Sequence, residues 1–160
     1  MLILPSWITK QDGYDRNHGP IQHKFAEEHD LTIDGLVSNP FKLSVQDLQT
    51  RFPQHTVTCT LSCAGNRRHT MRTRIKEVMG IDWFDGAVMN CTWEGPRLND
   101  VLLHAGVDKV SDEDKQQQKH VQFASYGTET QDDSWYGGSI PFDRATDPDM
   151  DVILAVKVSE

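Results

Sequence analysis

The sequence predicts an α+β domain in which strands and short helices share one hydrophobic core. The chain has 160 residues, of which 37% are hydrophobic, and this is enough for a single domain with a core of its own. Stretches of alternating apolar and polar residues, typical of half-buried strands, stand between stretches with helical spacing.

The first signals of regular structure follow a polar arm over residues 11–30, which favours irregular backbone. Residues 31–37 (LTIDGLV) alternate around an Asp-Gly pair, and this predicts a strand and a turn. Ser44 is expected to cap a short helix that reaches about Arg51, because Asp47 stands at the capping-box position.

Residues 57–63 (VTCTLSC) predict a strand that runs into the loop of Cys63, with Cys59 and Leu61 on the same apolar face. Cys59 and Cys63 would lie about 13 Å apart along this strand, too far for a disulfide. A helix is expected next, because apolar residues keep helical spacing up to a stop at Gly80; they are Met71, Ile75, Val78 and Met79.

The second half of the chain predicts one more helix and further strands. The helix covers about 97–105, with four apolar residues inward: Leu98, Val101, Leu102 and Ala105. Residues 120–124 predict a strand. Residues 152–156 (VILAV) are continuously apolar, which predicts a strand buried on both faces.

The charge distribution favours a small anion as ligand. The formal net charge of −8 argues against general nucleic-acid binding, which needs a basic surface. Five of the sixteen Lys and Arg nevertheless lie within residues 67–76. No stretch approaches the ~18 apolar residues of a membrane span, and no secretory signal is visible. We therefore expect a soluble intracellular protein, cytoplasmic or mitochondrial, with no nucleic-acid or membrane partner.

Cys63 opens the string CAGNRR, between the strand and the basic helix. Neighbouring guanidinium groups and the positive end of a helix both favour a thiolate, which can bind a soft metal beside an anion. Two alternatives stay open. A free cysteine is more often a small buried hydrophobe. A nucleophilic thiol would need a base, and His69 is the nearest candidate, although its spacing fits no hydrolase signature.

Two further strings carry functional groups. Residues 16–20 (RNHGP) offer a guanidinium, an amide and an imidazole that could hold phosphate or another oxyanion, or they form an exposed turn. Residues 135–141 (WYGGSIP) place the Tyr136 hydroxyl beside glycines that permit close approach of a ligand, or they pack at a turn. Trp83 follows the basic helix and is either a core residue or part of the wall of a pocket for the anion.

Together these strings resemble the molybdenum-cofactor domain of the sulfite oxidase family, which includes the eukaryotic assimilatory nitrate reductases. The amino-acid sequence of these strings is most similar to that of fungal members of the family. The matching strings run in order over about residues 14–156: RNHGP, LTIDGLV, CAGNRR, the Gly80–Trp83 stretch, GAVMNCTWEGPRLNDVLL, YGGSIP and DVILA.

The resemblance implies an α+β, mixed-sheet molybdopterin-binding domain over residues 1–160, with a molybdenum–pyranopterin (Mo-molybdopterin) cofactor. Cys63 would be the protein thiolate on molybdenum, which agrees with the preference of this metal for soft sulfur. Arg16 and Arg68 would grip the substrate oxyanion, and Tyr136 would be the active-site tyrosine.

The same resemblance assigns residues around the cofactor. Trp83 would line the substrate pocket, and Glu129 is the candidate for an acidic residue that contacts the cofactor. The loop that binds the pterin or its phosphate would be formed by Tyr14, Asp15, Arg16, Asn17 and His18.

The implied activity is oxidation of sulfite to sulfate, with electrons passed to an external acceptor such as oxygen or a cytochrome. A nitrate reductase-type molybdenum domain is the alternative, and so is a truncated, non-catalytic remnant that only binds anions. Family members continue with a basic segment that completes the cofactor site and with a domain that forms homodimers. The chain is therefore expected to be truncated at its C-terminus.

Overall fold

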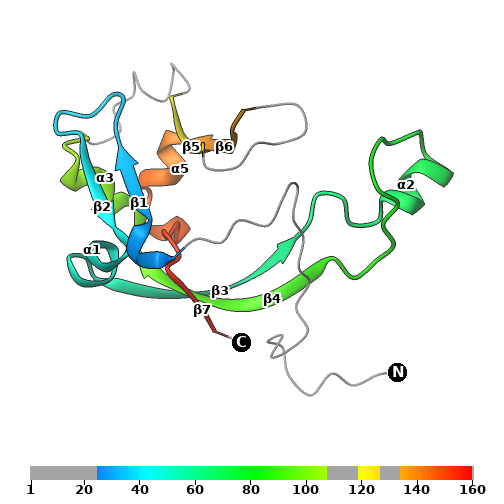
Figure 1. Ribbon diagram of the computed structural model, residues 1–160, viewed down its shortest axis with the longest axis horizontal. Helices are drawn as coiled ribbons and strands as arrows, with labels where there is room; N and C mark the ends of the chain where they lie inside the picture. Colours follow the sequence, from blue (N-terminus) through cyan, green and yellow to red (C-terminus); the bar gives the residue numbers. More distant parts are fainter. Residues whose placement is uncertain (1–24, 108–118, 127–133, 160) are drawn as a thin grey trace. The chain divides into compact units, whose positions relative to one another are not determined.

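The computed structural model describes residues 25–107, 119–126 and 134–159 (Figure 1). These residues fall into two compact units: one contains 58–93 with 158–159, and the other contains the remaining described residues. Helices and strands alternate in both, which confirms the α+β class. No helix within the described ranges is long and apolar enough to cross a membrane.

The larger unit begins with a strand pair and a capped helix. Strands β1 (Asp30–Ile33) and β2 (Phe41–Ser44) are antiparallel, with Leu31 opposite Leu43. The capping box of Ser44 and Asp47 is confirmed, with two bonds of 3.1 and 3.0 Å. The Ser44 backbone N–H, followed by its hydroxyl, holds the pKa of Asp47 below its usual value. The elements here are η1 (Ala26–Glu28), β1 (Asp30–Ile33), β2 (Phe41–Ser44) and α1 (Val45–Thr50).

The core of this unit is built around helix α3 (Leu98–His104), whose predicted apolar face is confirmed because all four of its inward residues are buried. Val101 packs with Leu43 and Leu48 in one cluster. Leu98 and Leu102 pack in a second cluster with Ala145, from α5 (Phe142–Thr146). Half-buried Leu154 packs against both clusters and therefore links them.

The buried strand expected over residues 152–156 is wrong. Only Ile153 forms an isolated bridge, with Arg97, and the regular strand β7 lies later, at Lys157–Ser159. The segment instead runs beside the end of β4 (Val88–Pro96), where Leu154 N–H donates to the Pro96 carbonyl at 2.9 Å. Its residues are half-buried or exposed, so apolarity here reflects packing on one side rather than two.

The double glycine lies in a strand rather than at a turn, which was one of the two alternatives open for it. β5 (His120–Ser125) and β6 (Tyr136–Pro141) pair antiparallel, with Gly137 opposite Ala124 and Gly138 opposite Phe123. A Cβ on Gly137 would lie 2.1 Å from the Phe123 carbonyl oxygen, whereas one on Gly138 would meet nothing within 4 Å. Gly137 therefore permits close strand pairing, and Gly138 faces open space.

The smaller unit contains residues 58–62 of the predicted strand, now β3 (Gln54–Ser62). It also contains helix α2 (Arg68–Arg74), which with its flanking loops connects β3 to β4 (Figure 1). The three-stranded order is β3-β4-β7, and both β3 and β4 contribute residues to the two units. The other short elements are β7 and η2 (Pro148–Met150), the latter in the larger unit.

Two expectations for the smaller unit are wrong. Helix α2 ends at Arg74 rather than near Gly80, and Ile75 and Met79 are 74% and 90% exposed. The predicted apolar face of β3 is also open, with Cys59 and Leu61 exposed. Polar contacts rather than apolar burial hold the chain after α2, so its apolar spacing does not extend the helix.

Candidate functional site

Cys63 lies in a tight turn directly after β3. Its backbone N–H donates to the Ala87 carbonyl at 2.9 Å, and its own carbonyl accepts from Asn66 N–H at 2.9 Å. The thiol is free and half-buried, and Gly65 N–H donates to Cys63 Sγ at 3.4 Å. A backbone donor aimed at sulfur favours negative charge there, as a metal-binding thiol requires.

The turn ends at Arg67, which has a left-handed backbone with φ of 64°. This conformation is costly for a residue with a side chain and needs support from its surroundings. The support comes from the loop before β4, since Arg67 N–H donates to the Phe84 carbonyl at 3.2 Å and Arg67 Nε pairs with Asp85 at 3.1 Å. Helix α2 therefore begins at Arg68, directly after a fixed turn.

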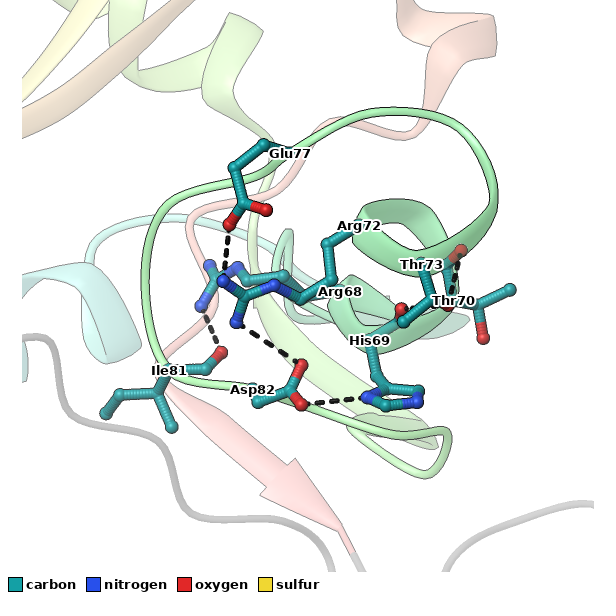
Figure 2. A network of polar contacts seen from close by, with 8 residues as sticks. All are labelled: Arg68, His69, Thr70, Arg72, Thr73, Glu77, Ile81 and Asp82. Carbon is teal, nitrogen blue, oxygen red and sulfur yellow. Dashed lines mark hydrogen bonds and ion pairs between the residues drawn. The ribbon is translucent and has the colours of Figure 1, made fainter.

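The Arg68 guanidinium is fixed beside the same turn. Its Nη1 donates to the Ile81 carbonyl at 2.7 Å (Figure 2). A Cβ on Gly65 would lie 2.8 Å from Nη2, and a Cβ on Gly80 would lie 2.6 Å from Nη1. The guanidinium thus rests against two glycine backbones, and Gly80 is further restricted to glycine by its φ of 115°.

Gly65 brings three of the predicted site residues together. Its N–H contacts Cys63 Sγ, its α-carbon faces the Arg68 guanidinium, and a Cβ there would lie 3.4 Å from Trp83 Cδ1. A side chain at position 65 would enter the space that these three groups share. A soft thiol, a guanidinium and an indole around one glycine can together hold a soft metal and a small oxyanion.

A second set of polar contacts fastens the loop after α2 to the helix (Figure 2). His69 Nδ1 donates to Asp82 Oδ2 at 2.8 Å, and its ring stacks on Phe84 with centroids 4.4 Å apart. Arg72 pairs with Glu77 and, at 3.8 Å, with Asp82. Asp82 binds His69 Nδ1, but among the described contacts the thiol of Cys63 is bonded to Gly65 N–H and not to His69, so the geometry gives no support to a Cys63–His69 nucleophile and base.

Two side chains of this network, Asp82 and Arg72, have shifted pKa values. The hydrogen bond from His69, with a smaller effect of Arg72, holds the pKa of Asp82 below its ordinary value of 3.8. Glu77, through a hydrogen bond and its charge, raises the pKa of Arg72. Both residues therefore carry full charge at neutral pH.

Acidification is expected to release the contact between Asp82 and His69. Because the pKa of Asp82 is lower in the folded protein than in the unfolded chain, its stabilising contribution is complete well above pH 3.8. That contribution is lost as the pH falls through the folded value. Denaturant unfolding between pH 6 and pH 3 measures it, and Asp82→Asn should flatten the pH dependence of the unfolding free energy. An unchanged pH slope in this variant would contradict the assignment.

Several predicted site residues cannot be placed beside these. Glu129 and the predicted cofactor loop lie outside the described residues; the loop consists of Tyr14, Asp15, Arg16, Asn17 and His18. Tyr136 begins β6 in the larger unit and is 62% exposed.

The donor set suits a metal that arrives with ligands of its own. In the part of the chain that the structure describes, no group of three or more His, Cys, Asp or Glu could hold a bare metal ion. Cys63 alone offers one soft sulfur, half-buried in a turn that its backbone bonds hold. One thiolate is sufficient for a preassembled metal–dithiolene group but not for a free ion. The residues present therefore fit a molybdenum–pyranopterin cofactor.

Sequence reasoning missed two parts of this arrangement. The Ile81 carbonyl fixes Arg68, but a backbone oxygen carries no signal in the sequence. Asp82 lies 13 residues from His69, and no helical or strand spacing links the two positions. Only the path of the loop after α2 brings them together.

Comparisons with known proteins also indicate a molybdopterin-binding domain. The family model described as oxidoreductase molybdopterin binding domain matches residues 18–160. Sulfite oxidase from Gallus gallus is 40% identical over 99% of this chain and 33% of its own length, and that from Arabidopsis thaliana is 36% identical over 98% and 40%. Nitrate reductase [NADH] from Ulva prolifera is 36% identical over 98% of this chain and 18% of its own length.

A solved structure has the same fold. The sulfane dehydrogenase SoxCD from Paracoccus pantotrophus superposes with a TM-score of 0.61 at 27% identity, over 86% of this chain and 31% of that one. Fold and sequence together define a molybdopterin-binding domain. The chain belongs to the oxidoreductase molybdopterin-binding domain family. It spans less than half the length of each of these relatives.

Proposed function

We propose that this chain contributes to the oxidation of sulfite to sulfate on a molybdenum–pyranopterin cofactor bound through Cys63. The observation that carries the proposal is the meeting of Cys63 Sγ, the Arg68 guanidinium and Trp83 around Gly65. The similarity to sulfite oxidases over almost the whole chain supports the choice of substrate.

Each residue has a distinct role in this proposal. Cys63 contributes the protein sulfur ligand, and Gly65 N–H stabilises negative charge on it. Arg68 attracts and orients the oxyanion by charge-assisted hydrogen bonds, while its Nη1 stays anchored to Ile81. Trp83 limits the space and excludes water from one side. Arg16 and Tyr136 are proposed as further oxyanion contacts, and Glu129 with residues 14–18 as cofactor contacts.

The overall reaction converts sulfite and water into sulfate, two protons and two electrons. The bound cofactor supplies the two-electron redox chemistry, whereas the protein positions and stabilises the anion. The electrons then pass to an external acceptor, either oxygen or a cytochrome. In this proposal the chain works in the cytoplasm or in mitochondria.

Nitrate is a second candidate substrate, because the nitrate reductase from Ulva prolifera is about as similar to this chain as the plant sulfite oxidase. Nitrate reduction consumes two electrons, so the direction of electron flow distinguishes the two activities. A chain that binds anions without turnover is the third outcome that an experiment must separate.

The test uses the full chain, produced in a host that makes the pyranopterin cofactor. We expect about one molybdenum per chain, pterin fluorescence after denaturation, and sulfite-dependent reduction of ferricyanide. Arg68→Lys keeps the charge but loses the planar fork, and it should raise KM for sulfite about tenfold to a hundredfold. Nitrate-dependent oxidation of a reduced viologen would favour the second candidate. Saturable sulfate binding by metal-free protein would support only the anion site. A protein that binds neither molybdenum nor sulfate would refute the proposal.

A further inference from the structure

The network around Asp82 has no role in the chemistry proposed above, yet it fixes the segment that holds Arg68 (Figure 2). Three side-chain contacts tie residues 77–84 to α2. Asp82 accepts from His69 and pairs with Arg72, which also binds Glu77. His69 N–H adds a backbone bond to the Trp83 carbonyl at 2.8 Å.

The position of the Ile81 carbonyl depends on these contacts. Residue 81 directly precedes Asp82, and the Gly80 before it has a backbone with φ of 115°, which glycine adopts without strain. The chain on that side can therefore rotate easily. On the other side of residue 81, Asp82 binds two basic side chains, His69 and Arg72, from successive turns of α2. Without Asp82, the pair of Glu77 with Arg72 would remain, but it lies four residues before Ile81, with the Gly80 backbone between them.

We infer that Asp82 is a positioning residue: by binding His69 and Arg72 of α2, it presents the Ile81 carbonyl to Arg68 and so orients the guanidinium toward the anion. This inference rests on the proposed oxyanion role of Arg68. A freely rotating guanidinium would lose part of its binding free energy as conformational entropy when the anion binds, whereas an anchored one is already ordered.

The chain offers a matched control in the same loop. Asp85 also pairs with an arginine, Arg67, at 3.1 Å, but both side chains are about 70% exposed, and the described hydrogen bond to the Ile81 carbonyl comes from Arg68 instead. Asp82→Ala and Asp85→Ala therefore remove the same charge from the same segment. Only the first removes the anchor of the Ile81 carbonyl.

Two measurements on the full chain test the inference. In nitrogen-15 NMR of arginine side chains, the ordered guanidinium signal of Arg68, assigned with Arg68→Lys, should disappear in Asp82→Ala and persist in Asp85→Ala. Sulfate titration should show affinity about tenfold weaker in Asp82→Ala and changed less than about twofold in Asp85→Ala. In an Arg68→Ala background, Asp82→Ala should weaken sulfate binding no further.

Each outcome decides a separate question. An ordered Arg68 signal in Asp82→Ala, or equal losses in both alanine variants, would overturn the inference. An ordered signal that depends on Asp82 in a protein that binds no sulfate would uphold the positioning role and refute the oxyanion role instead. If Asp82→Ala unfolds, His69→Phe keeps the stack on Phe84, removes the hydrogen bond and should give the same loss. Unfolding of both variants would make the network structural and the inference wrong.

Discussion

Cys63→Ser is expected to reduce both molybdenum content and sulfite-dependent turnover by more than about 100-fold. Changes to groups that merely support a metal ligand cost 10–100-fold, and this substitution removes the proposed ligand itself. Serine has nearly the same shape and can still accept the hydrogen bond from Gly65 N–H, so the turn should persist. The loss therefore reports the exchange of a soft sulfur for a hard oxygen.

Cys59→Ser is the matched control for this experiment. Cys59 lies four residues earlier, on β3, and is also free, but it is exposed. Metal analysis by mass spectrometry and ferricyanide reduction should give the parental values for this variant. A Cys63→Ser protein that keeps its molybdenum and its activity would show that another group binds the metal. Equal losses in both variants would point to damage to the strand rather than to a ligand.

The sequence correctly predicted the elements whose conformation is specified by residues close together along the chain. The capping box of Ser44 needs only residues 44–47, and the apolar face of α3 needs only one helix period, so both were predicted correctly. The strand that leads to Cys63 is also confirmed, since its alternation is local. In these three cases the residues that specify the element lie within it or directly beside it.

Predictions failed where distant segments decide the conformation. Residues 152–156 resemble a buried strand in composition, but they follow the end of β4 and form only one bridge. For the double glycine a turn was one open alternative, whereas Gly137 permits the close approach of Phe123 across a strand pair. In both cases the partner lies more than ten residues away, and no local rule identifies it.

The candidate site divides in the same way. Its chemical groups, Cys63 and Arg68, could be identified because they are adjacent in one distinctive string. Their anchors could not, because the Ile81 carbonyl and Asp82 reach them only through the path of the loop after α2. The motif therefore predicts which side chains bind the metal and the anion, and the fold determines how firmly those side chains are held.

Gly95→Ala is expected to destabilise the larger unit by about 3 kcal/mol. A Cβ at this position would lie 1.9 Å from the Leu154 carbonyl oxygen and 3.0 Å from Ala155 Cα. Both contacts are backbone atoms, so no side-chain rotation can relieve them. The segment from 152 to 156 would have to move away from β4 and break the bonds from Leu154 N–H to Pro96 and from Val156 N–H to Glu94.

The effect should be large because Leu154 packs against both core clusters of this unit, so its displacement would loosen two groups of buried side chains. For a chain of this size, the change corresponds to a fall in Tm of about 6–12 °C. Gly138→Ala is the control, since its Cβ would meet nothing, and alanine there should change stability by less than about 1 kcal/mol. Denaturant unfolding followed by circular dichroism measures both. Equal stability of the two variants would mean that the 152–156 segment does not lie against Gly95.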